Sequence, residues 1–294
     1  MSMIGTVLKG IGGFYYVLGA DGETYTLHAQ SKLRSKRLKP MVGDRVDFEP
    51  GTKNEDDGWL KSILPRKNEL VRPPVSNIDC LVITFSATVP EPDFLLIDRM
   101  LIAARQKNIE TVIAVNKCDT DSGRAEEMAR QYAASGSKVC LLSAHTQEGV
   151  TELKSALHGK IHAFAGQSGV GKSSLINALY ALEFEVGDIS DRIDRGKHTT
   201  RACSLVPVNG GAVLDTPGFS LLESDLIEPE KLQDFYPEFD TFKRDCRFQP
   251  CFHDSEPNCA VKEGVQSGVI SSERYERYKI LLNEMKERWL NRYD

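Results

Sequence analysis

One eight-residue segment restricts the possible folds of this chain more than any other. Residues 166–173 read Gly-Gln-Ser-Gly-Val-Gly-Lys-Ser, which matches G-x-x-x-x-G-K-[ST] in full. The residues before it (160–165) are mostly apolar, as in a buried strand, and those after it (174–180) are typical of a helix. Strand, glycine-rich turn and helix in this order form a phosphate-binding loop, or P-loop.

The residue types of the P-loop define its expected chemistry. Glycines let the backbone curl so that N–H groups converge on phosphate oxygens, and the helix N-terminus adds partial positive charge. We expect Lys172 to reach the β- and γ-phosphates and the Ser173 hydroxyl to bind Mg²⁺. The predicted nucleotide-binding residues of this segment are Gly166, Gln167, Ser168, Gly169, Val170, Gly171, Lys172, Ser173 and Ser174.

Length and charge set the broad class of the protein. The 294 residues, 40% of them hydrophobic, suffice for two or three domains with buried cores. The net charge of −5 gives no overall basic field, so binding of nucleic acid would need local patches. No apolar run approaches the ~20 residues of a membrane span, and residues 1–10 lack a signal-peptide core. We therefore expect a cytoplasmic protein that does not enter a membrane.

The N-terminal residues 1–66 are predicted to form a small β-barrel domain. Short β-prone runs recur there without a helical stretch, with turn residues at Gly12-Gly13 and Asp21-Gly22. About five such strands fit an OB-fold, with an SH3-like barrel as the alternative. Residues 32–39 carry five cations, which indicates either a solvated loop or a contact with nucleic-acid phosphates.

Residues 67–222 have the pattern of an α/β domain. Apolar runs at 78–85, 110–115, 138–142 and 160–165 alternate with helical patterns, which predicts a parallel sheet with helical crossovers. Asn209-Gly210 between two later β-prone runs predicts a hairpin.

The base of the nucleotide is predicted from Asn116-Lys117-Cys118-Asp119, which directly follows the strand at 110–115. Ligands bind at the carboxyl ends of strands in open α/β sheets. Asp119 can accept hydrogen bonds from N1–H and the exocyclic amine of guanine, which adenine cannot supply in that geometry, so an ATPase is disfavoured. Lys117 can lie along the base, Asn116 can bind the P-loop, and a backbone N–H of Ser143-Ala144, after the next strand, can meet guanine O6.

Two further segments are expected to respond to the γ-phosphate. Asp215-Thr216-Pro217-Gly218 follows a predicted strand as D-x-x-G, in which Asp215 would reach Mg²⁺ and the Gly218 N–H would meet the phosphate. Between this motif and the P-loop lie His198, Thr199 and Thr200, and we favour Thr200 over Thr199 as the Mg²⁺-sensing threonine.

The order of these motifs is permuted relative to Ras-like GTPases, in which the P-loop comes first and N-K-x-D near the end. Here N-K-x-D and Ser-Ala precede the P-loop, while D-x-x-G comes last. A circular permutation achieves this without moving a strand, because the termini of such a sheet can be joined and reopened elsewhere. The segment that ends at Gly218 therefore runs directly into the C-terminal region.

The C-terminal residues 223–294 are predicted to form a helical, zinc-binding domain. Three thiols and one imidazole occur within 14 residues, a closed Cys₃His set that suits one tetrahedral structural Zn²⁺. A helix is expected at 230–236 and a last one at 272–292, whose apolar stripe would dock onto the rest of the protein. The predicted ligands are Cys246, Cys251, His253 and Cys259.

These motifs together resemble the RsgA (YjeQ/YloQ) family of circularly permuted GTPases over essentially the whole chain. The resemblance implies GTP and GDP as ligands, Mg²⁺ with the nucleotide, binding to the 30S ribosomal subunit and its 16S rRNA, and a role in late maturation of that subunit. We expect the chain to be a monomer. One departure concerns the switch, because Arg201 stands where family members often have a third threonine.

Catalysis is expected to need the ribosome. Ras-like enzymes place a glutamine just after D-x-x-G to orient the attacking water, and Phe219 occupies that position here. His198, brought in when the switch orders, is our candidate for the missing group. The predicted catalytic residues are thus Lys172, Ser173, His198, Thr200, Asp215 and Gly218. The alternatives are a non-enzymatic nucleotide switch and a GTPase that acts on the large subunit or another RNA.

Overall fold

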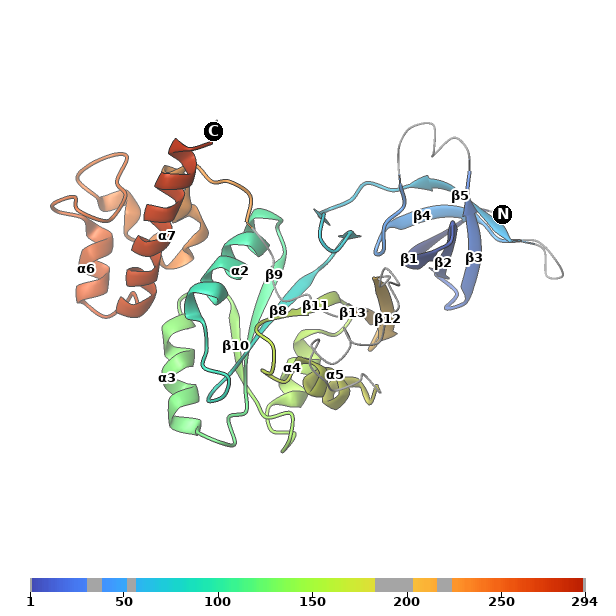
Figure 1. Ribbon diagram of the computed structural model, residues 1–294, viewed down its shortest axis with the longest axis horizontal. Coiled ribbons are helices and arrows are strands. Elements are labelled where there is room, and N and C mark those ends of the chain that lie inside the picture. Colours follow the sequence, from blue (N-terminus) through green and yellow to red (C-terminus); the bar gives the residue numbers. More distant parts are fainter. Residues whose placement is uncertain (1, 31–38, 52–56, 183–202, 216–223, 293–294) are drawn as a thin grey trace.

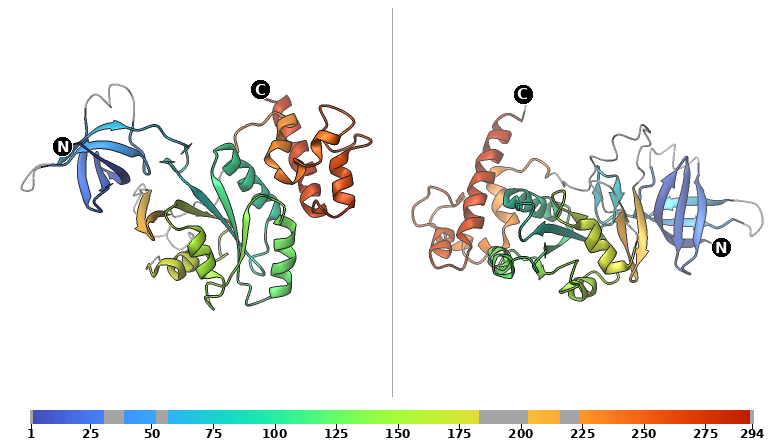
Figure 2. Two further views of the ribbon diagram at one scale, coloured as in Figure 1. Left: turned by 180° about the vertical axis from the view of Figure 1, so that it is seen from behind. Right: turned by 60° about the horizontal axis from the view of Figure 1, so that its bottom comes forward.

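In a computed structural model the protein is described at residues 2–30, 39–51, 57–182, 203–215 and 224–292. It has three parts in a row, with the N-terminal barrel at one end and the C-terminal helices at the other (Figure 1). The reverse view shows the same order, with a twisted sheet and its helices between the two ends (Figure 2). No helix within the described ranges is long and apolar enough to cross a membrane.

The N-terminal part is a closed five-stranded barrel, as the sequence predicts. Its strands pair in the order β1-β2-β3-β5-β4, and β4 pairs back onto β1. Inward and outward side chains alternate along each strand, and the inward set of Val17, Leu27, Val46, Phe48 and Leu60 is fully buried. The strands are β1 (Met3–Ile11), β2 (Phe14–Gly19), β3 (Thr24–Ala29), β4 (Arg45–Glu49) and β5 (Gly58–Ile63).

The central part is an open α/β sheet in the order β10-β9-β8-β11-β13-β12, parallel except for the β12–β13 hairpin. Its middle strands are buried on both faces, which explains their continuous apolar runs. One face packs against α2 and α3 and the other against α4 and α5. The elements are β8 (Cys80–Ser86), α2 (Phe94–Gln106), β9 (Glu110–Asn116), α3 (Ser122–Tyr132), β10 (Lys138–Leu141), α4 (Val150–Ala156), β11 (Ile161–Ala165), α5 (Lys172–Tyr180), β12 (Ser204–Val208) and β13 (Gly211–Asp215).

The barrel is joined to the central part by main-chain and side-chain contacts. Lys9 of β1 pairs with Ser204 of β12, which makes one sheet of eleven strands. Arg66 donates two hydrogen bonds to the fully buried carboxylate of Asp44 (Nε–Oδ1 2.7 Å, Nη2–Oδ2 2.8 Å). The Ser76 hydroxyl donates to the same carboxylate. Ser76 belongs to the small hairpin of β6 (Glu69–Leu70) and β7 (Val75–Ser76).

The C-terminal part packs on α2 and α3 through its last helix. Tyr275, Tyr278, Leu282 and Met285 of the predicted stripe are buried, while Trp289 at its end is half-buried. The helix expected at 230–236 is a 3₁₀ helix, because proline stands at its first position and again two residues after its end. The elements are η2 (Pro229–Phe235), η3 (Pro237–Phe239), η4 (Lys243–Asp245), α6 (Ala260–Gln266) and α7 (Ser272–Leu290).

A buried ionic network fixes α7 to α2. Arg274 is only 2% exposed and lies between Asp98 of α2, at 2.5 Å, and Glu238. The second oxygen of Asp98 accepts from Arg277, which also contacts Gln131 of α3. Because charges this deeply buried must be paired, the network fixes the position of the C-terminal part on the sheet domain.

Candidate nucleotide site and metal centre

The P-loop leaves β11 and turns into α5 at the carboxyl edge of the sheet. Gly166, Gly169 and Gly171 have positive φ angles of 141°, 77° and 93°, a region that side chains rarely adopt. A Cβ on Gly166 would lie 2.0 Å from the Thr84 carbonyl oxygen, and one on Gly171 would lie 2.5 Å from Asn116 Nδ2. Gly166 and Gly171 are therefore required by the close approach of the neighbouring strands β8 and β9, and Gly169 by its backbone conformation.

The side chain of Lys172 lies over this loop. Its ammonium donates to the carbonyl oxygens of Gly166 (2.7 Å) and Gln167 (2.6 Å). Ser173 and Ser174, in the first turn of α5, are half-buried. The ammonium and the helix N-terminus thus place positive charge where phosphate oxygens would lie.

Asn116 ties the guanine motif to the rest of the site. It ends β9 and is 2% exposed. Its Nδ2 donates to the Val170 carbonyl oxygen in the P-loop (2.9 Å), and its Oδ1 accepts from the Ala144 backbone N–H (3.1 Å). Three separated segments therefore meet at one side chain. Of the two backbone N–H groups of Ser143-Ala144 considered for guanine O6, that of Ala144 is engaged by Asn116 and that of Ser143 by the Glu148 carbonyl oxygen in this arrangement.

The other residues of the guanine motif divide between exposed and structural positions. Asp119 is exposed, while Lys117, with a φ of 65°, donates to the Gly169 carbonyl oxygen in the P-loop (2.9 Å). Cys118 is half-buried, with its thiol directed at the Val115 carbonyl oxygen, and burial raises the pKa of that thiol. Ser143 is buried and its hydroxyl accepts from the Thr146 N–H, so it shapes the turn that follows β10.

One segment beside the nucleotide site, the connection between β8 and α2, could not be recognised from the sequence. The connection between β8 and α2 is held on the P-loop by Gln167, whose side chain accepts from the Asp93 N–H (3.0 Å) and donates to the Glu91 carbonyl oxygen (3.2 Å). Lys117 donates to the Val89 carbonyl oxygen in the same connection. No sequence motif marks these contacts, because backbone groups are their partners.

The residues expected near the γ-phosphate are only partly within the described chain. Asp215 ends β13, beside β11 in the sheet, and so lies at the same edge as the P-loop. His198, Thr200 and Gly218, together with Phe219, lie outside the described residues.

We expect Gly171→Ala to abolish tight nucleotide binding, because the new methyl group would strike Asn116 and the φ of 93° is strained for alanine. The strain alone costs about 1–2 kcal/mol. GTP titration followed by calorimetry measures the loss. Gly159→Ala is the matched control, since its φ is 72° but nothing lies within 4 Å of the added carbon. Equal GTP affinity in both variants would contradict this account of the loop.

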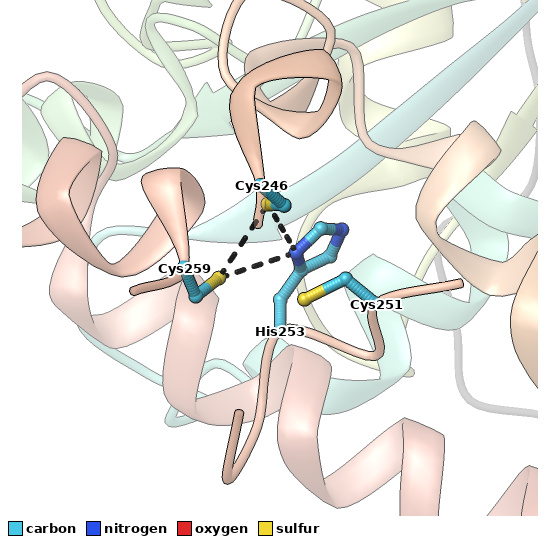
Figure 3. A group of neighbouring side chains, drawn as sticks. All are labelled: Cys246, Cys251, His253 and Cys259. Atoms are coloured by element: carbon cyan, nitrogen blue, oxygen red, sulfur yellow. Dashed lines mark hydrogen bonds between the residues drawn. The ribbon is translucent and has the colours of Figure 1, made fainter. Parts of the chain in front are cut away.

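The four predicted metal ligands converge in the C-terminal part. The side chains of Cys246, Cys251, His253 and Cys259 point toward one another (Figure 3), with their ligand atoms all within 4.8 Å. Cys246 Sγ and Cys259 Sγ are 3.8 Å apart, as expected for two sulfurs each about 2.3 Å from one tetrahedral Zn²⁺. All four residues are buried, so the set is closed and leaves no open position for a substrate.

Neighbouring groups orient the imidazole toward the sulfurs. His253 Nδ1 lies 3.5 Å from Cys246 Sγ and 3.4 Å from Cys259 Sγ, while its Nε2 is 2.8 Å from Gln233 Oε1. Since an amide oxygen only accepts, the ring proton sits on Nε2 and Nδ1 keeps its lone pair for a metal. Burial lowers the pKa of His253 to about 4, which also favours the neutral form that a metal requires. The cluster fits a structural zinc ion.

Aromatic residues of α7 anchor the metal loop. The Tyr275 hydroxyl donates to the His253 carbonyl oxygen (2.7 Å) and the Tyr278 hydroxyl to that of Phe252 (3.0 Å). The predicted docking stripe thus holds the metal loop as well as the sheet domain.

We expect the purified protein to contain about one zinc ion per chain and Cys251→Ser to lose it, since a closed site needs all four ligands. Native mass spectrometry measures the stoichiometry. Cys203→Ser, at a half-buried thiol outside the cluster, should retain the metal. A folded wild-type protein that contains no metal would rule out the zinc site.

A permuted motif order, a P-loop at the carboxyl edge of a six-stranded α/β sheet and a guanine motif joined to it through Asn116 define a circularly permuted P-loop GTPase. The model of the RsgA GTPase family matches residues 63–225, and that of the RsgA N-terminal domain matches residues 4–60. This chain belongs to the RsgA family.

The relatives match over nearly their full length. Small ribosomal subunit biogenesis GTPase RsgA of Geobacillus thermodenitrificans is 44% identical over 289 residues, covering 97% of this chain and 98% of its own. The protein of the same name from Caldanaerobacter subterraneus is 44% identical over 292 residues, with 98% of each chain covered.

Solved structures of RsgA-family proteins have the same fold over nearly the whole chain. The crystal structure of YjeQ from Thermotoga maritima gives a TM-score of 0.83 at 34% identity, covering 97% of this chain and 99% of that one. YloQ, described as a circularly permuted GTPase, gives 0.82 at 34% identity, with 98% and 96% covered.

Proposed function

We propose that this protein binds the small ribosomal subunit through its 16S rRNA and hydrolyses GTP in late maturation of that subunit, and that the subunit stimulates its turnover. Relatives 44% identical over 97% of the chain are named small ribosomal subunit biogenesis GTPases, and this match carries the proposal. The five cations at residues 32–39, within the sequence of the barrel domain, support a contact with RNA. We further propose that the protein acts as a cytoplasmic monomer with domains at 1–66, 67–222 and 223–294.

The following roles are proposed for the predicted site residues. Lys172 and the P-loop N–H groups would hold the β- and γ-phosphates, and Ser173, Thr200 and Asp215 would surround a Mg²⁺ ion that neutralises developing charge. The Gly218 N–H would meet the γ-phosphate. The guanine contacts are proposed for Asn116, Lys117, Cys118, Asp119, Ser143 and Ala144.

The group that orients the attacking water is proposed to be His198. Phe219, the residue after D-x-x-G, cannot hydrogen-bond water, so intrinsic hydrolysis should be slow. We expect His198→Ala to reduce subunit-stimulated turnover by roughly 10²-fold or more, as for loss of a general base or water-positioning group, while leaving GTP affinity unchanged. Single-turnover kinetics with small subunits measures this, and an unchanged rate would remove His198 from the mechanism.

Co-sedimentation tests the partner. With a non-hydrolysable GTP analogue the protein should sediment with small subunits and not with large ones. Sedimentation with large subunits alone would favour the alternative of a GTPase that acts on the other half of the ribosome.

A further inference from the structure

Gln167 is bound on one side by the lysine of the P-loop and on the other by the start of α2. Its backbone carbonyl oxygen accepts from the Lys172 ammonium (2.6 Å). Its side chain accepts from the Asp93 N–H (3.0 Å) and donates to the Glu91 carbonyl oxygen (3.2 Å). One half-buried residue therefore links the group expected to bind phosphate to the connection between β8 and α2.

The contact with Asp93 lies at the N-terminus of α2. Asp93 is the N-cap of this helix, and its carboxylate accepts from the Leu96 N–H (2.9 Å). Pro90 also lies beside the P-loop, since its Cδ would be 3.7 Å from a Cβ on Gly169. The end of a helix depends on partners outside it, because its terminal N–H groups have none within the helix. The P-loop thus helps to position the first turn of α2.

The same helix carries the C-terminal part, and it lies between the sheet and α7 (Figure 1). Asp98 in its second turn is 1% exposed and pairs with Arg274 and Arg277 of α7. Near its other end, Gln106 makes two hydrogen bonds with the backbone of Asp225 (2.9 and 3.3 Å). A helix of 13 residues is about 20 Å long and moves largely as a unit, so a shift of its first turn would reach α7.

Binding of phosphate must change the contacts of Lys172. An ammonium has three N–H donors, and contacts with the β- and γ-phosphates would occupy two of them. At most one of the two bonds to the Gly166 and Gln167 carbonyl oxygens can then remain. One of the two peptide groups that flank Gln167 therefore changes its partner when the nucleotide binds.

From these contacts we propose that Gln167 is a positioning residue that couples nucleotide binding to the C-terminal part. Its side chain carries the change at the P-loop to the first turn of α2, and Asp98 passes this change to α7. The route lies wholly within the described residues and does not use the segment that follows Asp215. The inference rests on the proposed role of Lys172 in phosphate binding.

Amide hydrogen exchange in the full-length protein tests the coupling. A non-hydrolysable GTP analogue with Mg²⁺ should slow exchange in the first turns of α7 by roughly fivefold or more relative to β2 and β3 of the barrel. The barrel is the internal reference, because general stabilisation by a bound ligand would slow exchange in both places alike. In Gln167→Met, whose side chain is similar in length but forms neither bond, α7 should respond no more than the barrel.

Arg124→Ala is the matched control for Gln167→Met. It removes the ion pair with the exposed Glu91 in the same connection and leaves both side-chain bonds of Gln167 in place. Exchange in α7 should therefore respond to the analogue as it does in the parent protein.

The coupling can also be measured from α7, because linkage between two binding events is reciprocal. Arg277→Gln should weaken binding of the analogue roughly fivefold or more in calorimetry, although Arg277 lies outside the nucleotide site. Arg288→Gln, at an exposed position of the same helix, should leave the affinity unchanged. Because the P-loop is intact in Arg277→Gln, its affinity decides the question even if Gln167→Met binds nucleotide poorly.

Three results would overturn the coupling: equal slowing in α7 and the barrel of the parent protein, an α7 response in Gln167→Met equal to that of the parent, or unchanged affinity in Arg277→Gln. If any of these occurs while small subunits still stimulate GTP turnover, the role of Gln167 fails and the proposed function stands. If the subunits do not stimulate turnover, the proposed function itself fails.

Discussion

Replacing Asp119 by asparagine is expected to convert the preference of the enzyme from GTP to xanthosine triphosphate. The carboxylate of Asp119 is proposed to accept from N1–H and the exocyclic amine of guanine. Asparagine would turn one acceptor into a donor, which matches the carbonyl group that xanthine carries in place of the amine. Sites built to hydrogen-bond one substrate reject a mismatched analogue by about 10⁴-fold, so the change in kcat/KM ratio should be large. Steady-state turnover with both nucleotides measures it.

Two controls belong to this experiment. Glu126→Gln, which makes the same carboxylate-to-amide change at an exposed position of α3 outside the guanine motif, should keep the GTP preference. The Asp119→Ala enzyme should use both nucleotides poorly, because alanine supplies neither the acceptor that guanine needs nor the donor that xanthine needs. An Asp119→Asn enzyme that still prefers GTP would place guanine recognition elsewhere.

Removing the carboxylate of Asp98 should have the second large effect, on stability. Asp98→Ala leaves Arg277 without its buried partner and Arg274 with Glu238 alone. Breaking a buried ion pair from one side costs about 3–5 kcal/mol, because a desolvated charge stays behind. Urea unfolding followed by Trp289 fluorescence reports on α7, once Trp59 is replaced by phenylalanine.

The neighbouring residue provides the matched control. Arg99→Ala breaks the pair with Glu284, whose side chains are 35% and 34% exposed, and should cost no more than about 1 kcal/mol. Similar costs for Asp98→Ala and Arg99→Ala would show that the buried network does not hold α7 in place.

The chemistry of both sites could be predicted from the sequence because their residues are close together along the chain. The P-loop spans residues 166–173, the guanine motif 116–119, and the metal ligands 246–259, so residue type and spacing already carry the geometry. The barrel strands could likewise be predicted from local features, namely short β-prone runs separated by turn residues. The structure confirms the barrel, the parallel sheet and the convergence of the four metal ligands.

Contacts between distant segments could not be predicted in this way. Asp98 meets Arg274 across 176 positions and Asp44 meets Arg66 across 22, and a single sequence shows such partners only as isolated charges. Gln167 occupies one of the variable positions of the P-loop motif, yet its side chain holds residues 91–93, in the connection between β8 and α2, by two hydrogen bonds.

The measurement that tests the central claim most directly is GTP turnover by the purified protein with and without ribosomal subunits. Alone, the protein should hydrolyse GTP slowly, near or below the ~10⁻⁴ s⁻¹ scale of unassisted Ras, because Phe219 stands where Ras-like enzymes have their water-orienting glutamine. Small subunits should raise the rate at least tenfold, and large subunits should not. Fast turnover by the protein alone, or equal stimulation by both subunits, would contradict the account.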